Sequence, residues 1–222
     1  VNGVGAPVAQ SAVMDWNKLY DFDGVDDKAY NAIYQDTTGT KSYKVHFIAH
    51  DVNSEGQIFQ IFNFSASKGV GATIDFLGTN NGTLGMRGFV SNSDYNIQSW
   101  NVEANTYYEL AFTINWDTNT IVSATLNGEN ATGSVSARID TSIGGLFLGG
   151  RNTQYYLNGI INYFEVVGDE KWTNASGFKS ESGSYDMTIT GSPSQILAPQ
   201  GLTSGRDITG VNLFENVRKQ GA

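Results

Sequence analysis

Hydrophobic and polar residues alternate with a period of two along most of this chain. One face of the stretch YYELAFTINW is apolar and comprises Tyr108, Leu110, Phe112, Ile114 and Trp116. Its other face carries Glu109, Thr113 and Asn115. This alternation predicts a strand with one buried face. The turn DTNT follows, and then IVSATLNG, with Val122, Ala124 and Leu126 on one side. Together the two stretches predict a β-hairpin.

Similar short runs recur along the chain, each bounded by Gly, Asn, Asp or Ser. YKVHFIAHDV, for example, places Val45, Phe47 and Ala49 on one face. No segment before residue 205 keeps a helical period for three turns. Short strands at regular spacing predict an all-β fold, a two-sheet antiparallel jelly-roll β-sandwich.

The two ends differ from this alternating middle and divide the chain into three regions. We predict an N-terminal arm over 1–15, a sandwich over 16–193, and a linker with a C-terminal arm over 194–222. Trp16 and Trp172 flank the sandwich and are interpreted as core residues. Because the arms carry apolar residues, we expect them to bind neighbouring subunits. Whether the chain is a fragment of a longer polypeptide stays open.

Charge and composition exclude several classes of protein. Among the 222 residues the formal net charge is −9, and the lysines and arginines are scattered. Nucleic acid or an anionic membrane would require a basic patch, so neither is expected as a partner. The absence of cysteine excludes disulfides, thiolate metal sites and a cysteine nucleophile. No apolar stretch is long enough to span a bilayer, so we expect no membrane insertion.

Four aspartates lie in the stretch LYDFDGVDDKAY. Asp21 and Asp23 alternate with aromatic residues and therefore face away from the buried side of a strand. GVDD then predicts a turn, in which Asp26 and Asp27 accept local backbone N–H bonds. We interpret these aspartates as structural residues and not as metal ligands.

The order of several motifs resembles a known superfamily. FDGVDD is followed by YYELAFTINWDTNTIVSATLNGE, GGLFLGGR and YLNGIINYFEVVG. Over residues 16–178 this order is similar to the laminin-G-like branch of the concanavalin A-like lectin/glucanase superfamily. The resemblance implies a jelly roll that binds glycans or proteins, as found in secreted adhesins, carbohydrate-active enzymes and phage virion proteins. The tail GLTSGRDITGVNLFENVRKQGA is similar to segments that join modules in phage structural proteins.

The chain lacks a convincing catalytic constellation. The string nearest to the glucanase motif is EVVGDE, in which Glu165 and Asp169 would share a strand face. On a strand they would lie about 13 Å apart, too far for a retaining pair, so we expect no enzyme. His46 and His50 show the same spacing, so one ion cannot bind both. We interpret them as two surface histidines.

One loop has the composition of a cation site. DVNSEG places Asp51, Asn53 and Glu55 as in the first half of a calcium loop, but position twelve is Phe62. A plain turn between strands and a calcium ion near these residues are both left open. Elsewhere we expect no cofactor and no metal ligands.

Two clusters have the chemistry of a glycan site, namely aromatic rings beside planar amide or guanidinium groups. They lie in SDYNIQSW and RNTQYY, and the candidate ligand-binding residues are Tyr95, Asn96, Trp100, Arg151, Asn152, Tyr155 and Tyr156. The alternative is that Trp100 and one of the tyrosines belong to the core or to a subunit interface.

These observations favour a non-catalytic lectin-like structural module, of a virion or an extracellular protein, that binds glycans or a host cell surface. A phage tail fibre is one setting for this role. The alternative is a capsid or tail decoration protein that binds only neighbouring virion subunits, with the arms as the contacts, and a glycan-active enzyme ranks third. Either role suits a homo-oligomer.

Overall fold

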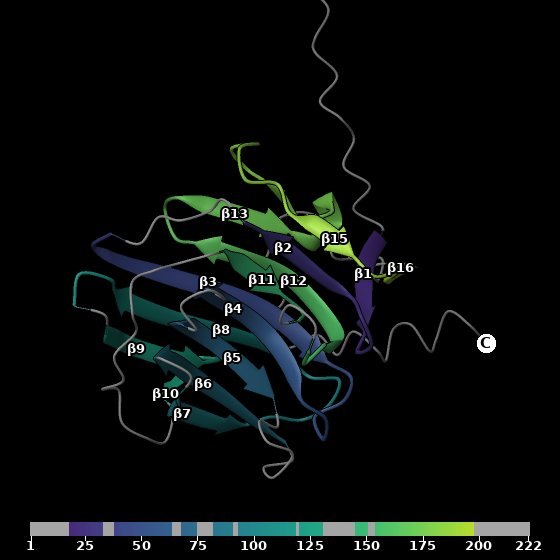
Figure 1. Ribbon diagram of the computed structural model, residues 1–222. Helices are drawn as coiled ribbons and strands as arrows, with labels where there is room; N and C mark the ends of the chain where they lie inside the picture. The colour runs from purple at the N-terminus through teal and green to yellow at the C-terminus, as the bar shows by residue number, and fades with distance from the viewer. Residues whose placement is uncertain are drawn as a thin grey trace, which may run out of the picture.

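The computed structural model describes residues 18–32, 38–63, 68–74, 82–90, 93–118, 120–130, 145–150 and 154–197. The predicted N-terminal arm, Trp16 and most of the C-terminal arm lie outside these residues. The described chain is almost entirely β-structure and forms two antiparallel sheets (Figure 1). The predicted jelly-roll sandwich is therefore confirmed.

The larger sheet has nine strands, seven of them in the order β10-β9-β8-β3-β12-β1-β16. Strand β13 pairs with β12 and with β14. Their bounds are β1 Lys18–Asp23, β3 Thr40–Ala49, β8 Tyr107–Asn115, β9 Thr120–Leu126, β10 Glu129–Asn130, β12 Asn158–Val166, β13 Glu170–Thr173, β14 Lys179–Ser180 and β16 Ser194–Leu197.

The smaller sheet has seven strands in the order β15-β2-β11-β4-β5-β6-β7. Their bounds are β2 Lys28–Asn31, β4 Gly56–Asn63, β5 Lys68–Ile74, β6 Thr83–Val90, β7 Ser93–Asn101, β11 Leu146–Leu148 and β15 Thr188–Thr190. Among the described residues the one helical segment is the 3₁₀ turn η2, Asn174–Ser176. None of the described helices is long and apolar enough to cross a membrane.

Aromatic side chains from both sheets meet in the core. Phe112 of β8 stacks on Tyr43 of β3 with ring centroids 4.8 Å apart. Its ring also stacks on Phe59 of the smaller sheet at 4.7 Å. Trp172 is fully buried, as predicted. These contacts join the two sheets through burial of apolar area, the main stabilising contribution in such a fold.

The hairpin of β8 and β9 forms as predicted, but Val122 does not share a face with Ala124 and Leu126 as the alternation predicted. Leu110 and Phe112 are buried, which confirms the apolar face of β8. Val122, however, is 52 % exposed, while Ile121 is buried. The register shifts between Thr113 and Ile114, where an irregularity in the pairing turns Val122 outwards. Strict alternation in the sequence does not reveal such a bulge.

The first and the last strand of the described chain, β1 and β16, pair with each other. Strand β1 lies between β12 and β16, and β16 extends four residues into the predicted linker. The buried side chain of Asn174 fastens β1 further, because its Nδ2 donates to the carbonyl of Tyr20 at 2.9 Å and its Oδ1 accepts from the Tyr20 amide at 2.6 Å. A strand at the edge of a sheet pairs through its backbone groups and need not alternate in side-chain type, so the sequence pattern did not predict β16.

Candidate functional site

A groove of about 380 Å³ is lined by residues of β7, β8, β9 and β10 and of the turn between β9 and β10. Figure 1 shows these four strands at the same end of the sandwich. It is lined by Ser99, Trp100, Asn101, Tyr108, Leu126, Asn127, Glu129 and Asn130. We call it the end groove. Its residues come from the last positions of β7, from Tyr108 of β8, and from the end of β9 with the turn and β10 that follow.

Two aromatic residues, Trp100 and Tyr108, line the end groove and are held by hydrogen bonds. The indole Nε1 of Trp100 donates to the carbonyl of Glu129 at 3.0 Å, which ties β7 to β10. The phenol oxygen of Tyr108 accepts from the amide of Glu103 at 2.8 Å. Both side chains are only 8 % exposed. Trp100 packs in the core and also lines the groove. The core alternative is therefore confirmed for Trp100, while its role in ligand binding stays a prediction.

The rim of the groove is polar and includes a β-hairpin turn. Asn127 and Gly128 both have positive φ, 50° and 82°, as a two-residue hairpin loop requires. The Asn127 side chain accepts from the amide of Glu109 at 2.8 Å, so this residue has a structural role. Asn101, Glu129 and Asn130 are exposed. Amides and a carboxylate beside two aromatic side chains provide donors and acceptors for a ligand rich in hydroxyl groups.

The other sequence-predicted site residues are not all brought to this groove. Tyr95 and Asn96 belong to β7, opposite Gly88 and Arg87, but their side chains lie outside the described residues, as do Arg151 and Asn152.

The second tyrosine cluster lies beside β2 and β4, away from the end groove. Tyr155 has a φ of 59°, and its carbonyl accepts from the amide of Gln57. The ring of Tyr156 lies under the Lys28 ammonium, 5.7 Å from the ring centroid. In the smaller sheet, β5 and β6 separate β4 from β7. The two predicted clusters therefore do not form one site.

The turn after β1 gathers three carboxylates. Oxygens of Asp23, Asp26 and Asp27 lie within 4.8 Å of one another. Asp27 is fully buried, and its two oxygens accept from the amides of Asp23 at 3.0 Å and Ser192 at 2.8 Å. Burial raises the pKa of Asp27, and the neighbouring carboxylates act in the same direction. The predicted backbone bond is confirmed for Asp27, while the expectation of no metal stays a prediction.

The loop Asp51–Glu55, which has the composition of a calcium loop, is a hydrogen-bonded turn. Asp51 accepts from the amide of Asn53 at 2.8 Å. Hydrogen bonds from the Ser54 side chain and then from this amide lower the pKa of Asp51. These bonds are the ones expected of an Asx turn between β3 and β4.

The glucanase-like string also has structural contacts. Glu170 is buried and accepts from the amide of Ser182 at 3.1 Å and from its hydroxyl. Asp169 lies in the turn before β13 and pairs with Lys41 at 3.5 Å.

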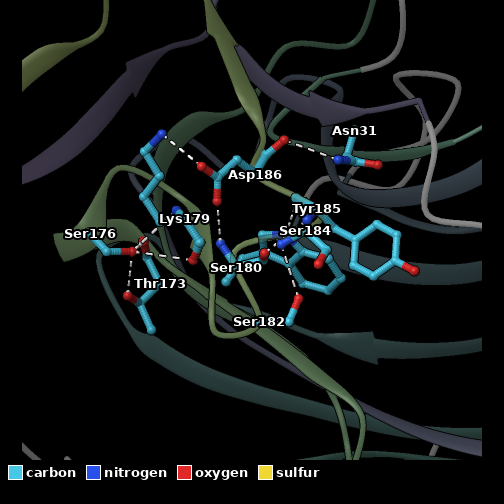
Figure 2. Close-up of polar contacts among 10 residues, drawn as sticks. Asn31, Thr173, Ser176, Lys179, Ser180, Ser182, Ser184, Tyr185 and Asp186 are labelled. Carbon is cyan, nitrogen blue, oxygen red and sulfur yellow. Dashed lines mark hydrogen bonds and ion pairs between the residues drawn. The ribbon is translucent and has the colours of Figure 1, made fainter.

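A serine-rich loop between β14 and β15 is fixed by Asp186 (Figure 2). One carboxylate oxygen accepts from Lys179 Nζ at 2.8 Å and the other from the amide of Ser180 at 2.9 Å. The Lys179 bond and then the Ser180 bond lower the pKa of Asp186. Its carbonyl accepts from Asn31 Nδ2 at 3.0 Å, which joins the loop to β2 of the other sheet. This network has the arrangement of a structural clamp.

The histidines depart from the sequence-based interpretation. His46 is only 5 % exposed, so it is not the surface residue that was expected. Its Nε2 lies 2.7 Å from Glu109 Oε2 and 2.7 Å from Tyr163 Oη, and its Nδ1 contacts Tyr107 Oη. Burial lowers the pKa of His46. The tyrosines cover the imidazole, and they were missed because they come from two other strands.

His50 lies at the end of the same strand in a different environment. It is half-buried between Asp21, at 2.8 Å, and Asn105, at 2.9 Å. Burial alone would lower its pKa, but the hydrogen bond and the charge of Asp21 outweigh burial and raise it.

Comparison with known proteins shows the fold. No protein-family model matches the chain, and no curated protein matches it by sequence. Among solved structures, domains LG4-5 of the mouse laminin α1 chain superpose with a TM-score of 0.54 and 11 % identity over 89 % of this chain and 50 % of theirs. A proposed carbohydrate-binding protein from Bacteroides ovatus gives 0.52 and 12 % over 82 % of this chain and 60 % of its own.

The superposition with a third neighbour covers almost the full length of that neighbour's chain. The heptameric SAP-like pentraxin of Limulus polyphemus superposes with a TM-score of 0.50 and 10 % identity, over 84 % of this chain and 97 % of its own. All three neighbours have lectin-like jelly rolls, so the fold part of the predicted resemblance is confirmed.

Proposed function

We propose that this chain is a lectin-like module that binds neutral glycans in the end groove and does not cleave them. The observation that carries the proposal is the composition of the groove: Trp100 and Tyr108 beside exposed Asn101, Glu129 and Asn130. Its volume of about 380 Å³ falls within the range of small-ligand sites, about 300–1,000 Å³. The Bacteroides ovatus protein of the same fold supports this class of ligand.

Charge favours neutral sugars over acidic ones. The residues that line the groove include Glu129 and neither lysine nor arginine. An acidic sugar would place its carboxylate or sulfate near Glu129, without a cation to offset the repulsion. The net charge of −9 acts in the same direction. Neutral hexoses with several hydroxyl groups can instead donate to Glu129 and exchange hydrogen bonds with both asparagines.

The test is a glycan array that contains neutral, sialylated and sulfated oligosaccharides, followed by titration calorimetry on each hit. We expect neutral glycans to bind and Glu129→Gln or Asn130→Ala to weaken binding at least about tenfold, about 1.4 kcal/mol. Glu181→Gln is the matched control, because Glu181 is also an exposed glutamate but lies beyond β14, outside the groove. Binding confined to acidic glycans, or binding weakened as much by the control, would contradict the proposal.

The location of the protein and its assembly with other subunits also stay proposals. A virion or extracellular location is supported by the resemblance of the tail at residues 201–222 to module-joining segments of phage structural proteins. The alternative decoration role and a homo-oligomer rest on the apolar arms, which lie outside the described residues. Deleting both arms and measuring sedimentation and incorporation into the parent assembly tests both of these predictions. Normal assembly of the truncated chain would leave the arms as linkers.

A further inference from the structure

The turn between β9 and β10 contains an asparagine followed by a glycine at the rim of the end groove. Leu126 pairs with Glu129, so Asn127 and Gly128 form a two-residue hairpin loop. Both loop residues are exposed. A Cβ atom added to Gly128 would have no heavy atom within 4 Å. The peptide bond between the two residues is therefore open to water.

An asparagine that precedes a glycine can react with its own backbone. The glycine nitrogen loses its proton to hydroxide and attacks the asparagine Cγ, so that an N–Cγ bond forms, the Cγ–Nδ2 bond breaks, and Nδ2 leaves as ammonia. Water then opens the resulting succinimide ring at either carbonyl, which gives aspartate or isoaspartate. The net change is a gain of water and a loss of ammonia, without an oxidant or reductant. Glycine favours the attack because it has no side chain beside its nitrogen.

We propose that Asn127 is a site of spontaneous deamidation and that its products change the end groove. The amide of Glu109 donates to Asn127 Oδ1 at 2.8 Å. Negative charge develops on this oxygen when Cγ is attacked, and a backbone N–H that is already aimed at the oxygen stabilises that charge, as in an oxyanion hole. Within the part of the chain that the structure describes, Nδ2 makes no hydrogen bond that would hold the leaving group.

A second asparagine–glycine pair, Asn158 and Gly159, has the same chemistry in a different backbone. Asn158 is also exposed, but Gly159 lies within β12, between Phe22 of β1 and Ala49 of β3. A Cβ atom added to Gly159 would lie 2.2 Å from the carbonyl oxygen of Ile48, because the neighbouring strand packs so closely. Turning the Gly159 nitrogen toward the Asn158 side chain would break the pairing with both strands. We therefore expect this pair to react more slowly than the pair in the turn.

Both products alter the rim of the end groove. Aspartate at position 127 adds a negative charge to the residues that line the groove with Glu129. Isoaspartate adds a methylene to the backbone and lengthens the loop between Leu126 and Glu129. The pairing of these two residues and the bond from Trp100 Nε1 to the Glu129 carbonyl depend on this loop. Weaker ligand binding after deamidation is a consequence that rests on the proposed function, whereas the reaction itself does not.

The experiment incubates the full chain for several weeks at pH 6 and at pH 8.5, with and without a denaturing concentration of guanidinium chloride. Peptide mapping by mass spectrometry follows each asparagine, and an isoaspartate methyltransferase detects isoaspartate. In the folded chain we expect Asn127 to react at least about tenfold faster than Asn158, a difference in barrier of about 1.4 kcal/mol. The reaction should be faster at pH 8.5, because the attacking nitrogen must lose its proton. In denaturant the two asparagines should react at similar rates, because only the folded backbone distinguishes them.

Asn127→Asp and the isoaspartate fraction separate the effect of charge from the effect of loop length. In a chain labelled for NMR spectroscopy, the Nε1–H signal of Trp100, assigned with Trp100→Phe, reports the bond to Glu129. We expect the signal to shift in the isoaspartate fraction and to stay in place in Asn127→Asp, whose carboxylate still accepts from the Glu109 amide. The proposal is overturned if Asn127 keeps its amide in the folded chain, if Asn158 reacts as fast, or if isoaspartate leaves the signal in place. A glycan array without hits would remove the proposed function and leave these outcomes unchanged.

Discussion

The inner and outer faces of strands β3 and β8 are stabilised in different ways, although the same backbone carries both. The inner face buries Val45, Phe47, Leu110 and Phe112, whose contribution follows the apolar area removed from water. The outer face buries His46, which depends on hydrogen bonds to three partners of the correct geometry. Apolar packing tolerates small shifts in geometry, whereas the outer cluster loses its partners when one strand slips.

The largest effect is expected on the inner face. Phe112→Ala should reduce the free energy of unfolding by about 3–5 kcal/mol, because it removes a ring that stacks on both sheets and leaves a cavity. Leu110→Ala should cost about 2–5 kcal/mol. Urea denaturation measures both values. Losses below about 1 kcal/mol would mean that this face contributes less than its burial indicates.

A smaller effect is expected from the centre of the outer face. His46→Ala leaves Glu109 and Tyr163 without their ring-nitrogen partner, and losing such a partner at a buried site costs about 1–3 kcal/mol. The measurement is the same urea denaturation. A variant as stable as the unaltered chain would show that the cluster does not contribute to folding.

The contribution of His50 to stability should depend on pH. Because the pKa of His50 is raised above its ordinary value of 6.5, its contribution is fully present below that pH and is lost as the pH rises through the folded-state pKa. The pair is half-buried, so we expect at most about 1 kcal/mol. The difference in urea midpoint between the unaltered chain and His50→Gln should therefore shrink from pH 5.5 to pH 8.5. A difference that grows with pH would contradict the assigned direction.

The smallest effect is expected at Thr113, which is the outer neighbour of Phe112. Its hydroxyl lies 3.0 Å from Ser42 Oγ in an exposed pair. Thr113→Ala should change the free energy of unfolding by no more than about 0.5 kcal/mol. A loss equal to that of Phe112→Ala would mean that the two faces are inverted.

The contrast between the faces also explains how far the sequence could be interpreted. Alternation predicted the burial of Leu110, Phe112 and Phe47, because burial on a strand depends only on period and side-chain type. It failed at Val122, where a bulge breaks the period.

The candidate sites depended on register and were less predictable. Trp100 was singled out from its chemistry, but its groove partners on β9 and β10 were not, because a local motif does not specify which strands adjoin. For the same reason the tyrosines around His46 were missed, since Tyr107 and Tyr163 lie 61 and 117 residues from it.

The pairing of β1 and β2 has a consequence for the order in which the chain folds. Both partners of β1, namely β12 and β16, begin at or after Asn158, and both partners of β2, namely β11 and β15, begin at or after Leu146. As the ribosome releases the chain from its N-terminus, these first two strands have no sheet to join until most of the remaining strands exist. Closing such long loops is entropically costly and slows folding. The strands β4 to β7 pair in sequence order, as do β8 to β10, so we expect these two meanders to form early and the first strands to be inserted last.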